Sequence, residues 1–174
     1  MLIQLADIID EPFHWAETTS IEASSLGRNL LVGLGRISWT GEVSRASKGH
    51  LLTCRLEYEQ KLTCSRCLEP TPMSVAADVR LLLQSRGSEP TLGEVELENE
   101  DLDVFYVDGD ELDTELILIE QVQLNIPMRE LCREDCRGLC PMCGSDRNQE
   151  KCGCEESPID ARWEALKNLR VSDE

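Results

Sequence analysis

Cysteines constrain this chain more than any other feature of its sequence. Six of the nine cysteines fall within residues 131–154, which read LCREDCRGLCPMCGSDRNQEKCGC. Eight of the nine form close pairs, and only Cys54 stands alone. Two sulfur atoms this close in sequence can reach one ion at about 2.3 Å, so eight paired thiolates can form two tetrahedral metal sites. The pairs are Cys64/Cys67, Cys132/Cys136, Cys140/Cys143 and Cys152/Cys154.

Disulfide bonds are a poor explanation of these pairs. Nine cysteines cannot all pair within one chain. The first residues, Met1–Asp7, carry no basic leader, and no apolar run approaches the roughly 18 residues that a membrane span requires. We therefore expect a cytoplasmic protein, in which glutathione keeps thiols reduced and structural disulfides are rare.

The spacing of the pairs favours one division of the ligands between two zinc ions. Cys64, Cys67, Cys132 and Cys136 would join an expected strand to the segment that follows an expected helix. Other divisions, such as the four cysteines of residues 132–143 on one ion, are open as well, and so is the number of ions, one or two. Four thiolates also suit an iron–sulfur cluster. The compact set on the other zinc ion, which encloses a loop of eight residues, is Cys140, Cys143, Cys152 and Cys154.

We expect both sites to be structural. A catalytic zinc ion keeps one position open for water and usually has histidine or carboxylate ligands. The chain has only two histidines, His14 and His50, and neither lies near a cysteine pair. A redox dithiol at Cys64 and Cys67 is disfavoured, because this pair does not open a helix after a buried parallel strand. The residues therefore indicate structural zinc and no catalytic site.

Basic residues accompany the cysteines. A zinc ion with four thiolates carries a net negative charge, so nearby cations can donate hydrogen bonds to sulfur. The same cations can contact RNA phosphates, while few aromatic side chains are available for base stacking. Both interpretations apply to five residues: Arg66, Arg133, Arg137, Arg147 and Lys151.

The formal net charge of −17 comes almost entirely from one segment. Residues 89–120 contain 13 acidic residues and no lysine or arginine, whereas the parts on either side are nearly balanced. Such a segment repels nucleic acid at long range and attracts basic partners. It would either bind a basic protein or remain a solvated loop that aids solubility.

Hydrophobic periodicity predicts an α+β fold, in which an antiparallel β-meander packs with one amphipathic helix at residues 112–126. Asp110 or Asp113 would cap this helix, and Pro127 would end it. A strand at residues 116–119 is the alternative. The expected inward face of the helix is Leu112, Leu116, Ile119 and Ile126, with Val122 beside it. Expected strands lie at residues 30–39, 50–58, 60–64, 73–83 and 103–107, with a turn at Thr40-Gly41-Glu42.

These elements suggest three parts of the chain. Residues 1–130 would form the α+β core, including the acidic segment 89–120. Residues 131–156 would form a cysteine-rich zinc module pinned to that core. Residues 157–174 would form a C-terminal helix and tail, with Ile159, Trp163, Leu166 and Leu169 on one helical face.

Several of these features occur together in one known family. Residues 62–70, LTCSRCLEP, are followed by the acidic middle, by the helix ending at Pro127 and by the cysteine-rich block. The chain then carries SPIDARWEALKNLR, in which a proline leads into a short helix. In this order, over roughly residues 20–170, the sequence resembles the YceD-like large ribosomal RNA subunit accumulation proteins. Those proteins vary in the second cysteine cluster and usually have Asn-Leu-Asn where this chain has Ser145–Asn148.

The resemblance implies a bacterial or plastid-type factor that is needed for accumulation of large-subunit rRNA and has no enzymatic activity. The first hypothesis is therefore a non-enzymatic assembly factor that contacts 23S rRNA through its zinc-stabilised end. The second is a chaperone-like module whose acidic segment holds a basic ribosomal protein. A metal-dependent nuclease is disfavoured, because Asp101 and Asp103 have no positioned base or substrate-binding lysine beside them.

Overall fold

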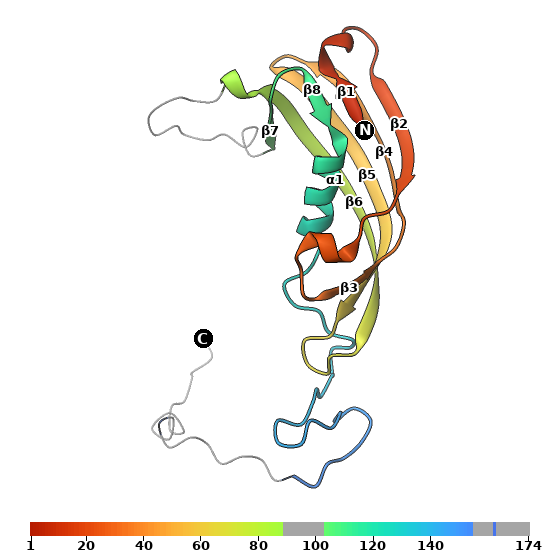
Figure 1. The fold of residues 1–174 in the computed structure, drawn as a ribbon, viewed down its shortest axis with the longest axis vertical. Helices are drawn as coiled ribbons and strands as arrows, with labels where there is room; N and C mark the ends of the chain where they lie inside the picture. Colours follow the sequence, from red (N-terminus) through yellow and green to blue (C-terminus); the bar gives the residue numbers. More distant parts are fainter. Residues whose placement is uncertain (89–102, 155–161, 163–174) are drawn as a thin grey trace, which may run out of the picture.

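The computed structural model describes residues 1–88, residues 103–154 and Arg162. Its main element is a curved sheet whose strands are β2 (Phe13–Thr19), β3 (Leu31–Leu34), β4 (Ile37–Ala46), β5 (Gly49–Thr63), β6 (Pro70–Ser85) and β7 (Val104–Val107). The strand order is β2-β4-β5-β6-β7, and β3 pairs with the part of β5 that β4 leaves free (Figure 1). The predicted antiparallel pairing is confirmed from β2 to β6, while β7 runs parallel to β6.

The long hairpin of β5 and β6 forms the centre of this sheet. Its pairing runs from His50 opposite Leu83 to Thr63 opposite Pro70. Along β5 the even-numbered residues 52–62 are buried, and the odd-numbered residues between them are exposed or half-buried. This alternation is typical of a strand with one face on the core. The strands predicted at residues 50–58 and 60–64 are therefore one continuous strand.

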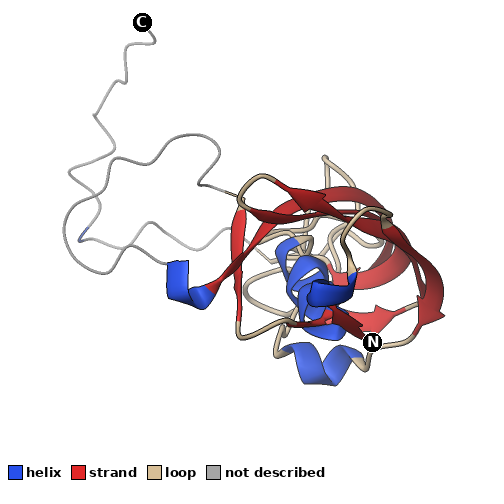
Figure 2. Ribbon diagram, turned by 90° about the horizontal axis from the view of Figure 1, so that it is seen from above, coloured by secondary structure: helices blue, strands red, loops and turns tan. Residues whose placement is uncertain are grey.

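Helix α1 (Thr114–Leu124) lies on the concave side of the sheet, which curves around it (Figures 1 and 2). Asp113 caps the helix, because its carboxylate accepts a hydrogen bond from the backbone N–H of Glu115 at 3.0 Å. At the other end, the buried Gln60 side chain of β5 donates to the carbonyl oxygen of Asn125 at 3.3 Å. The helix residues buried in the common core with the sheet are Ile117, Leu118 and Val122.

A second, two-stranded sheet stands at the start of α1. It consists of β1 (Leu2–Gln4) and β8 (Glu111–Asp113), which pair in antiparallel fashion. The fully buried Thr114 donates both its backbone N–H and its hydroxyl to the carbonyl oxygen of Met1, each at 3.0 Å. The sequence pattern predicts neither β1 nor β2, since β1 has only three residues and β2 buries only Trp15.

The helix is shorter than the expected 112–126, and its buried face includes Ile117 and Leu118 in place of Leu116. Leu112 is buried as part of β8, and Leu116 is 60% exposed. Residues 116–119 are all apolar, so their pattern alone does not select a face. Thr114, which is hydrogen-bonded to Met1, begins the buried face of the helix that continues with Ile117 and Leu118. The helical interpretation of this segment is confirmed, and Val122 and Ile126 are buried as predicted.

The predicted turn at residues 40–42 is wrong, because these residues lie in the middle of β4. Gly41 faces the core between Trp15 on β2 and Cys54 on β5. A Cβ atom at Gly41 would overlap the Trp15 ring and would lie 2.7 Å from the Cβ of Cys54. Here glycine marks a close approach of a neighbouring side chain and not a reversal of the chain. The Trp15 ring packs edge-on against Trp39, with 5.2 Å between the ring centroids.

Two predicted features lie outside the described residues. They are the acidic residues 89–102 and the helix at residues 158–170, of which only Arg162 is described. In the part of the chain that the structure describes, no helix is both long and apolar enough to cross a membrane.

Replacing Gly41 with alanine should destabilise the fold. Because the added methyl group must displace Trp15 or Cys54, we expect the free energy of unfolding to fall by about 1–3 kcal/mol. Urea denaturation followed by tryptophan fluorescence would measure this change. Gly33→Ala is the matched control in the same sheet, since its nearest neighbouring atom would be the Cβ of Lys61 at 3.5 Å. Equal stability of the two variants would contradict the packing role of Gly41.

Candidate metal centres

The β5–β6 hairpin carries the first cysteine pair at its tip. Cys64 continues the buried alternation of β5 by one step, so its side chain is fully buried. The backbone N–H of Leu68 donates to the Cys64 carbonyl oxygen, and the Cys64 N–H donates to the Glu69 carbonyl oxygen, both at 3.0 Å. Leu68 adopts a φ of 63°, a left-handed conformation that reverses the chain into β6. This turn places Cys67 beside Cys64.

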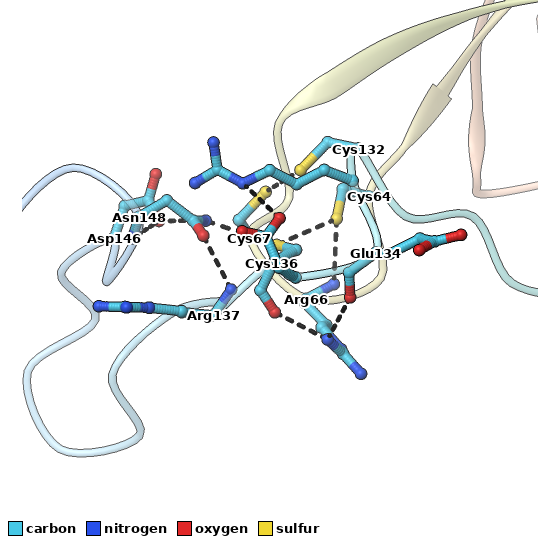
Figure 3. A network of polar contacts seen from close by, with 11 residues as sticks. Cys64, Arg66, Cys67, Cys132, Glu134, Cys136, Arg137, Asp146 and Asn148 are labelled. Atoms are coloured by element: carbon cyan, nitrogen blue, oxygen red, sulfur yellow. Dashed lines mark hydrogen bonds and ion pairs between the residues drawn. The ribbon is translucent and has the colours of Figure 1, made fainter.

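The segment after α1 supplies the second pair to the hairpin tip. The sulfur of Cys64 lies 3.8 Å from that of Cys136, and the sulfur of Cys67 lies 3.6 Å from that of Cys132 (Figure 3). All four sulfur atoms lie within 4.8 Å of one another. We name this group cluster 1, and its members are Cys64, Cys67, Cys132 and Cys136.

The spacing of the sulfur atoms in cluster 1 suits a site with four sulfur ligands. Four ligands at about 2.3 Å from one ion lie about 3.8 Å apart, which agrees with the two short sulfur–sulfur distances. Three of the four cysteines are buried, together with the partly buried Leu131. The backbone N–H of Ser65 donates to the Glu130 carbonyl oxygen at 2.8 Å and joins the two segments. Cluster 1 could therefore hold a metal ion.

The backbone around cluster 1 favours the thiolate form of Cys64. Burial raises the pKa of this thiol, but backbone hydrogen bonds from Cys67, Cys132 and Arg66 outweigh burial and lower the pKa to about 6. Cys132 is the exposed member of the cluster, and partial desolvation of its sulfur by the neighbouring groups, together with hydrogen bonds with the other sulfurs, raises its pKa to about 12. Four thiolates at these distances repel one another, so a fully ionised cluster requires a cation at its centre.

The other four predicted cysteines form cluster 2, which is built on the turn CPMCG. The Gly144 N–H donates to the Cys140 carbonyl oxygen at 2.8 Å, and its φ of 73° suits glycine. The Ser145 hydroxyl lies 3.0 Å from the Cys143 sulfur, and its hydrogen bond lowers the pKa of that thiol to about 6. The four sulfur atoms again lie within 4.8 Å of one another. The members of cluster 2 are Cys140, Cys143, Cys152 and Cys154.

The structure thus brings together the two groups of four that the spacing favours. The alternative group, the four cysteines of residues 132–143, is divided between the clusters. Neither histidine belongs to a cluster in the described part of the chain, and His14 instead lies 3.4 Å from Glu42 on the sheet. The unpaired Cys54 is a buried core residue as expected, and burial raises its pKa to about 11.

Asn148 reaches cluster 1 from the loop of cluster 2 (Figure 3). Its side-chain amide donates to the Cys136 sulfur at 3.4 Å, and its Oδ1 accepts from the backbone N–H of Arg137 at 2.8 Å. Asp146 accepts a hydrogen bond from the same amide at 2.7 Å. Asn148 is not among the site residues predicted from the sequence, because a polar loop residue carries no signal of its own. Its only signal is its place five residues after Cys143.

Two of the five predicted basic residues lie at cluster 1 without neutralising its sulfur atoms. The Arg66 guanidinium points away from the sulfurs and donates to the Cys136 carbonyl oxygen at 2.8 Å (Figure 3). Arg133 forms an exposed ion pair with Asp135, with 3.4 Å between Nε and Oδ1. Backbone N–H groups and the Asn148 amide hydrogen-bond to the sulfur atoms of cluster 1 instead.

The other three basic residues, Arg137, Arg147 and Lys151, line one open pocket of about 480 Å³ together with Glu150 and Cys152. A hydrogen bond with Cys140 is the largest effect that lowers the pKa of Cys152, and Arg147 adds a smaller one. Within the described residues, the Arg137 and Lys151 side chains have no ion-pair partner. The structure therefore gathers on one side of cluster 2 three of the cations that the sequence assigned either to sulfur or to RNA.

The chain is similar to several known proteins. An uncharacterized protein of Mycobacterium tuberculosis is 34% identical over 124 residues, which cover 71% of this chain and 57% of that protein. A protein of Arabidopsis thaliana named large ribosomal RNA subunit accumulation protein YCED homolog 1, chloroplastic, is 28% identical over 130 residues, which cover 63% of this chain and 40% of that protein. The chain thus spans about half the length of the curated relatives it matches. No solved structure matches it.

A family model described as large ribosomal RNA subunit accumulation protein YceD matches residues 52–170. The match begins within β5 and continues through the hairpin tip, α1 and all eight clustered cysteines. The order of these elements agrees with the resemblance that the sequence motifs indicated. The chain therefore belongs to the YceD family of large ribosomal RNA subunit accumulation proteins.

Proposed function

We propose that this protein is a non-enzymatic factor in large ribosomal subunit biogenesis, which supports the accumulation or processing of 23S rRNA. Two structural zinc ions would hold its cysteine-rich segment in shape, and its partner would be the rRNA or an assembly intermediate. Family membership supports the link to large-subunit rRNA. The observation that carries the proposed RNA contact is the pocket of Arg137, Arg147 and Lys151 at cluster 2.

Zinc is the metal that suits the donor set best. Each cluster offers four sulfur atoms and no open position, and zinc prefers this closed tetrahedral arrangement in structural sites. An ion in cluster 1 would fasten the hairpin tip to the segment after α1. An ion in cluster 2 would fix the loop that carries Arg147 and Lys151. Because such sites do not exist in the unfolded chain, metal binding would stabilise the folded one.

RNA contact through this pocket would be to phosphates. The chain carries a net charge of −17 and few aromatic residues, so neither long-range attraction nor base stacking would drive binding. A local group of cations, with two side chains unpaired among the described residues, provides an attraction that acts at short range. We place the remaining predicted basic residues, Arg66 and Arg133, at the margin of this surface.

The acidic-module alternative finds less support in the described residues. Several acids of residues 103–120 already have structural partners there. Asp108 pairs with Arg86 at 3.1 Å, and Glu111 accepts from Gln4 at 2.8 Å. Asp113 caps α1. These three side chains take part in the fold of the chain itself, and residues 89–102 lie outside the described part.

Protein purified without chelator should contain two zinc ions per chain. Cys132→Ser and Cys154→Ser should each lower this content by one, because each removes a ligand from a different cluster. Cys54→Ala is the control and should retain both ions. Elemental analysis of the four proteins measures the result. Iron in place of zinc, or a metal content that the two cluster variants leave unchanged, would contradict the proposed sites.

Neutralising the pocket should weaken binding to a large-subunit rRNA transcript without loss of metal. For the variant Arg137→Gln/Arg147→Gln/Lys151→Gln, the slope of log affinity against log salt should become shallower by about 2, since each phosphate contact contributes about 0.7–0.9. A filter-binding titration at several salt concentrations would measure this slope, and elemental analysis would verify the metal content.

The matched control removes three exposed cations, two on the sheet and one between β3 and β4, through Arg45→Gln, Lys61→Gln and Arg36→Gln. It changes the net charge by the same amount but leaves the pocket intact. Equal losses in the two variants would show a general charge effect, and no loss in the pocket variant would exclude the pocket as the RNA contact.

A further inference from the structure

We propose that the two cysteine clusters bind metal cooperatively and that Asn148 is the positioning residue that couples them. The inference rests on the proposed metal binding and adds a property that two independent structural sites would lack. It starts from the three hydrogen bonds of the Asn148 side chain, which connect the loop of cluster 2 to a ligand of cluster 1.

The orientation of the Asn148 side chain follows from its neighbours. The backbone N–H of Arg137 can only donate, so it must face the side-chain oxygen of Asn148 at 2.8 Å. The carboxylate of Asp146 can only accept, so it must face the side-chain nitrogen at 2.7 Å. The same nitrogen is left directed at the Cys136 sulfur at 3.4 Å. A hydrogen bond of this kind stabilises a thiolate ligand.

The backbone between the clusters is short and closely packed. Only three residues separate Cys136 of cluster 1 from Cys140 of cluster 2. Among them, the Leu139 N–H donates to the Arg66 carbonyl oxygen at 3.0 Å. Gly138 has a φ of 69°, and a Cβ there would lie 2.8 Å from the same oxygen. This linker has little freedom to move independently of the hairpin tip.

The loop that carries Asn148 is closed by cluster 2. Residues 144–151 lie between Cys143 and Cys152, two ligands of that cluster. Within the loop, the Arg147 N–H donates to the Gly138 carbonyl oxygen at 3.0 Å. An ion in cluster 2 would fix both ends of the loop. The loop would then lose little further conformational entropy when Asn148 contacts Cys136.

Cooperativity follows from this arrangement. An ion in cluster 2 holds Asn148 against Cys136 and thereby strengthens cluster 1. By linkage, an ion in cluster 1 strengthens cluster 2 by the same factor. Groups that hydrogen-bond to metal ligands commonly change metal affinity by about 10–100-fold. We expect a coupling factor of about tenfold, since the cluster retains its other N–H···S hydrogen bonds.

The test measures the metal affinity of cluster 1 with and without an intact cluster 2. Cys152→Ser/Cys154→Ser removes two ligands of cluster 2 and leaves all four residues of cluster 1 in place. The ¹¹³Cd resonance that survives in this variant identifies cluster 1, and competition with a chromophoric zinc chelator then gives its affinity. The same measurements are made on the full-length chain, on Asn148→Ala and on the combination of all three substitutions.

We expect the cluster 1 affinity to fall about tenfold in Cys152→Ser/Cys154→Ser, and to the same extent in Asn148→Ala. Because both changes remove the same contact, the combined variant should show no further loss. Asn148→Asp keeps the acceptor for Arg137 but lacks the donor to sulfur, so it should lose affinity too. Gln149→Ala, an exposed neighbour in the same loop, is the control and should bind as the unaltered chain does.

Other outcomes separate this proposal from the one on which it rests. If the unaltered chain binds two ions and Asn148→Ala leaves the affinity of cluster 1 unchanged, the coupling is excluded while the metal sites stand. Additive losses in the combined variant would likewise exclude Asn148 as the link. If the unaltered chain binds no metal, both proposals fail.

Discussion

The convergence of four cysteine sulfurs at the tip of the β5–β6 hairpin is the constraint on which the rest of this structure depends. It joins Cys64 to Cys136 and Cys67 to Cys132, pairs that lie 72 and 65 positions apart in the chain. The sheet and α1 already hold the two segments near each other, but among the described residues Leu131 is the one apolar residue packed against the buried cysteines, so packing does little to hold four thiolates together. A bound cation would supply both the missing free energy and the neutralisation that closely spaced thiolates require.

The packing of the helix on the sheet brings these sulfur atoms close together. The inward alternation of β5 runs through Leu52, Leu56 and Leu62 and puts Cys64 on the core face at the end of the strand. The helix α1 returns the chain along the concave side of the sheet and ends where Gln60 binds the Asn125 carbonyl oxygen. From there only a few residues lead to Cys132. The α+β core therefore brings together the two cysteine pairs of cluster 1.

Much of this arrangement could be predicted from local patterns. The two strands of the β5–β6 hairpin, the helix before Pro127 and the pairing of nearby cysteines each have a signal that depends on a few neighbouring residues, whereas the strand expected at residues 30–39 is divided between β3 and β4. The grouping of the pairs into two clusters also followed from spacing, because a short loop is the easiest to close. In these cases the preference of a short segment and its tertiary setting agree.

The features that the sequence did not predict differ from these, because each depends on a contact with a residue outside its own short segment. Gly41 has the sequence pattern of a turn residue, but its place in β4 is explained by the Trp15 ring that packs against it. The inward face of α1 begins at Thr114, whose partner Met1 lies 113 positions away in the sequence. Asn148 acquires its role only when its loop folds against Cys136. No local pattern contains that information.

X-ray absorption at the zinc edge of the purified full-length chain would test the central claim most directly, because it counts the atoms around the ion. Two closed clusters of cysteine ligands should give four sulfur neighbours per zinc ion at about 2.3 Å and no nitrogen or oxygen bound to the ion. Nitrogen or oxygen ligands, or fewer than four sulfur neighbours, would contradict the assignment of the two clusters as closed structural sites.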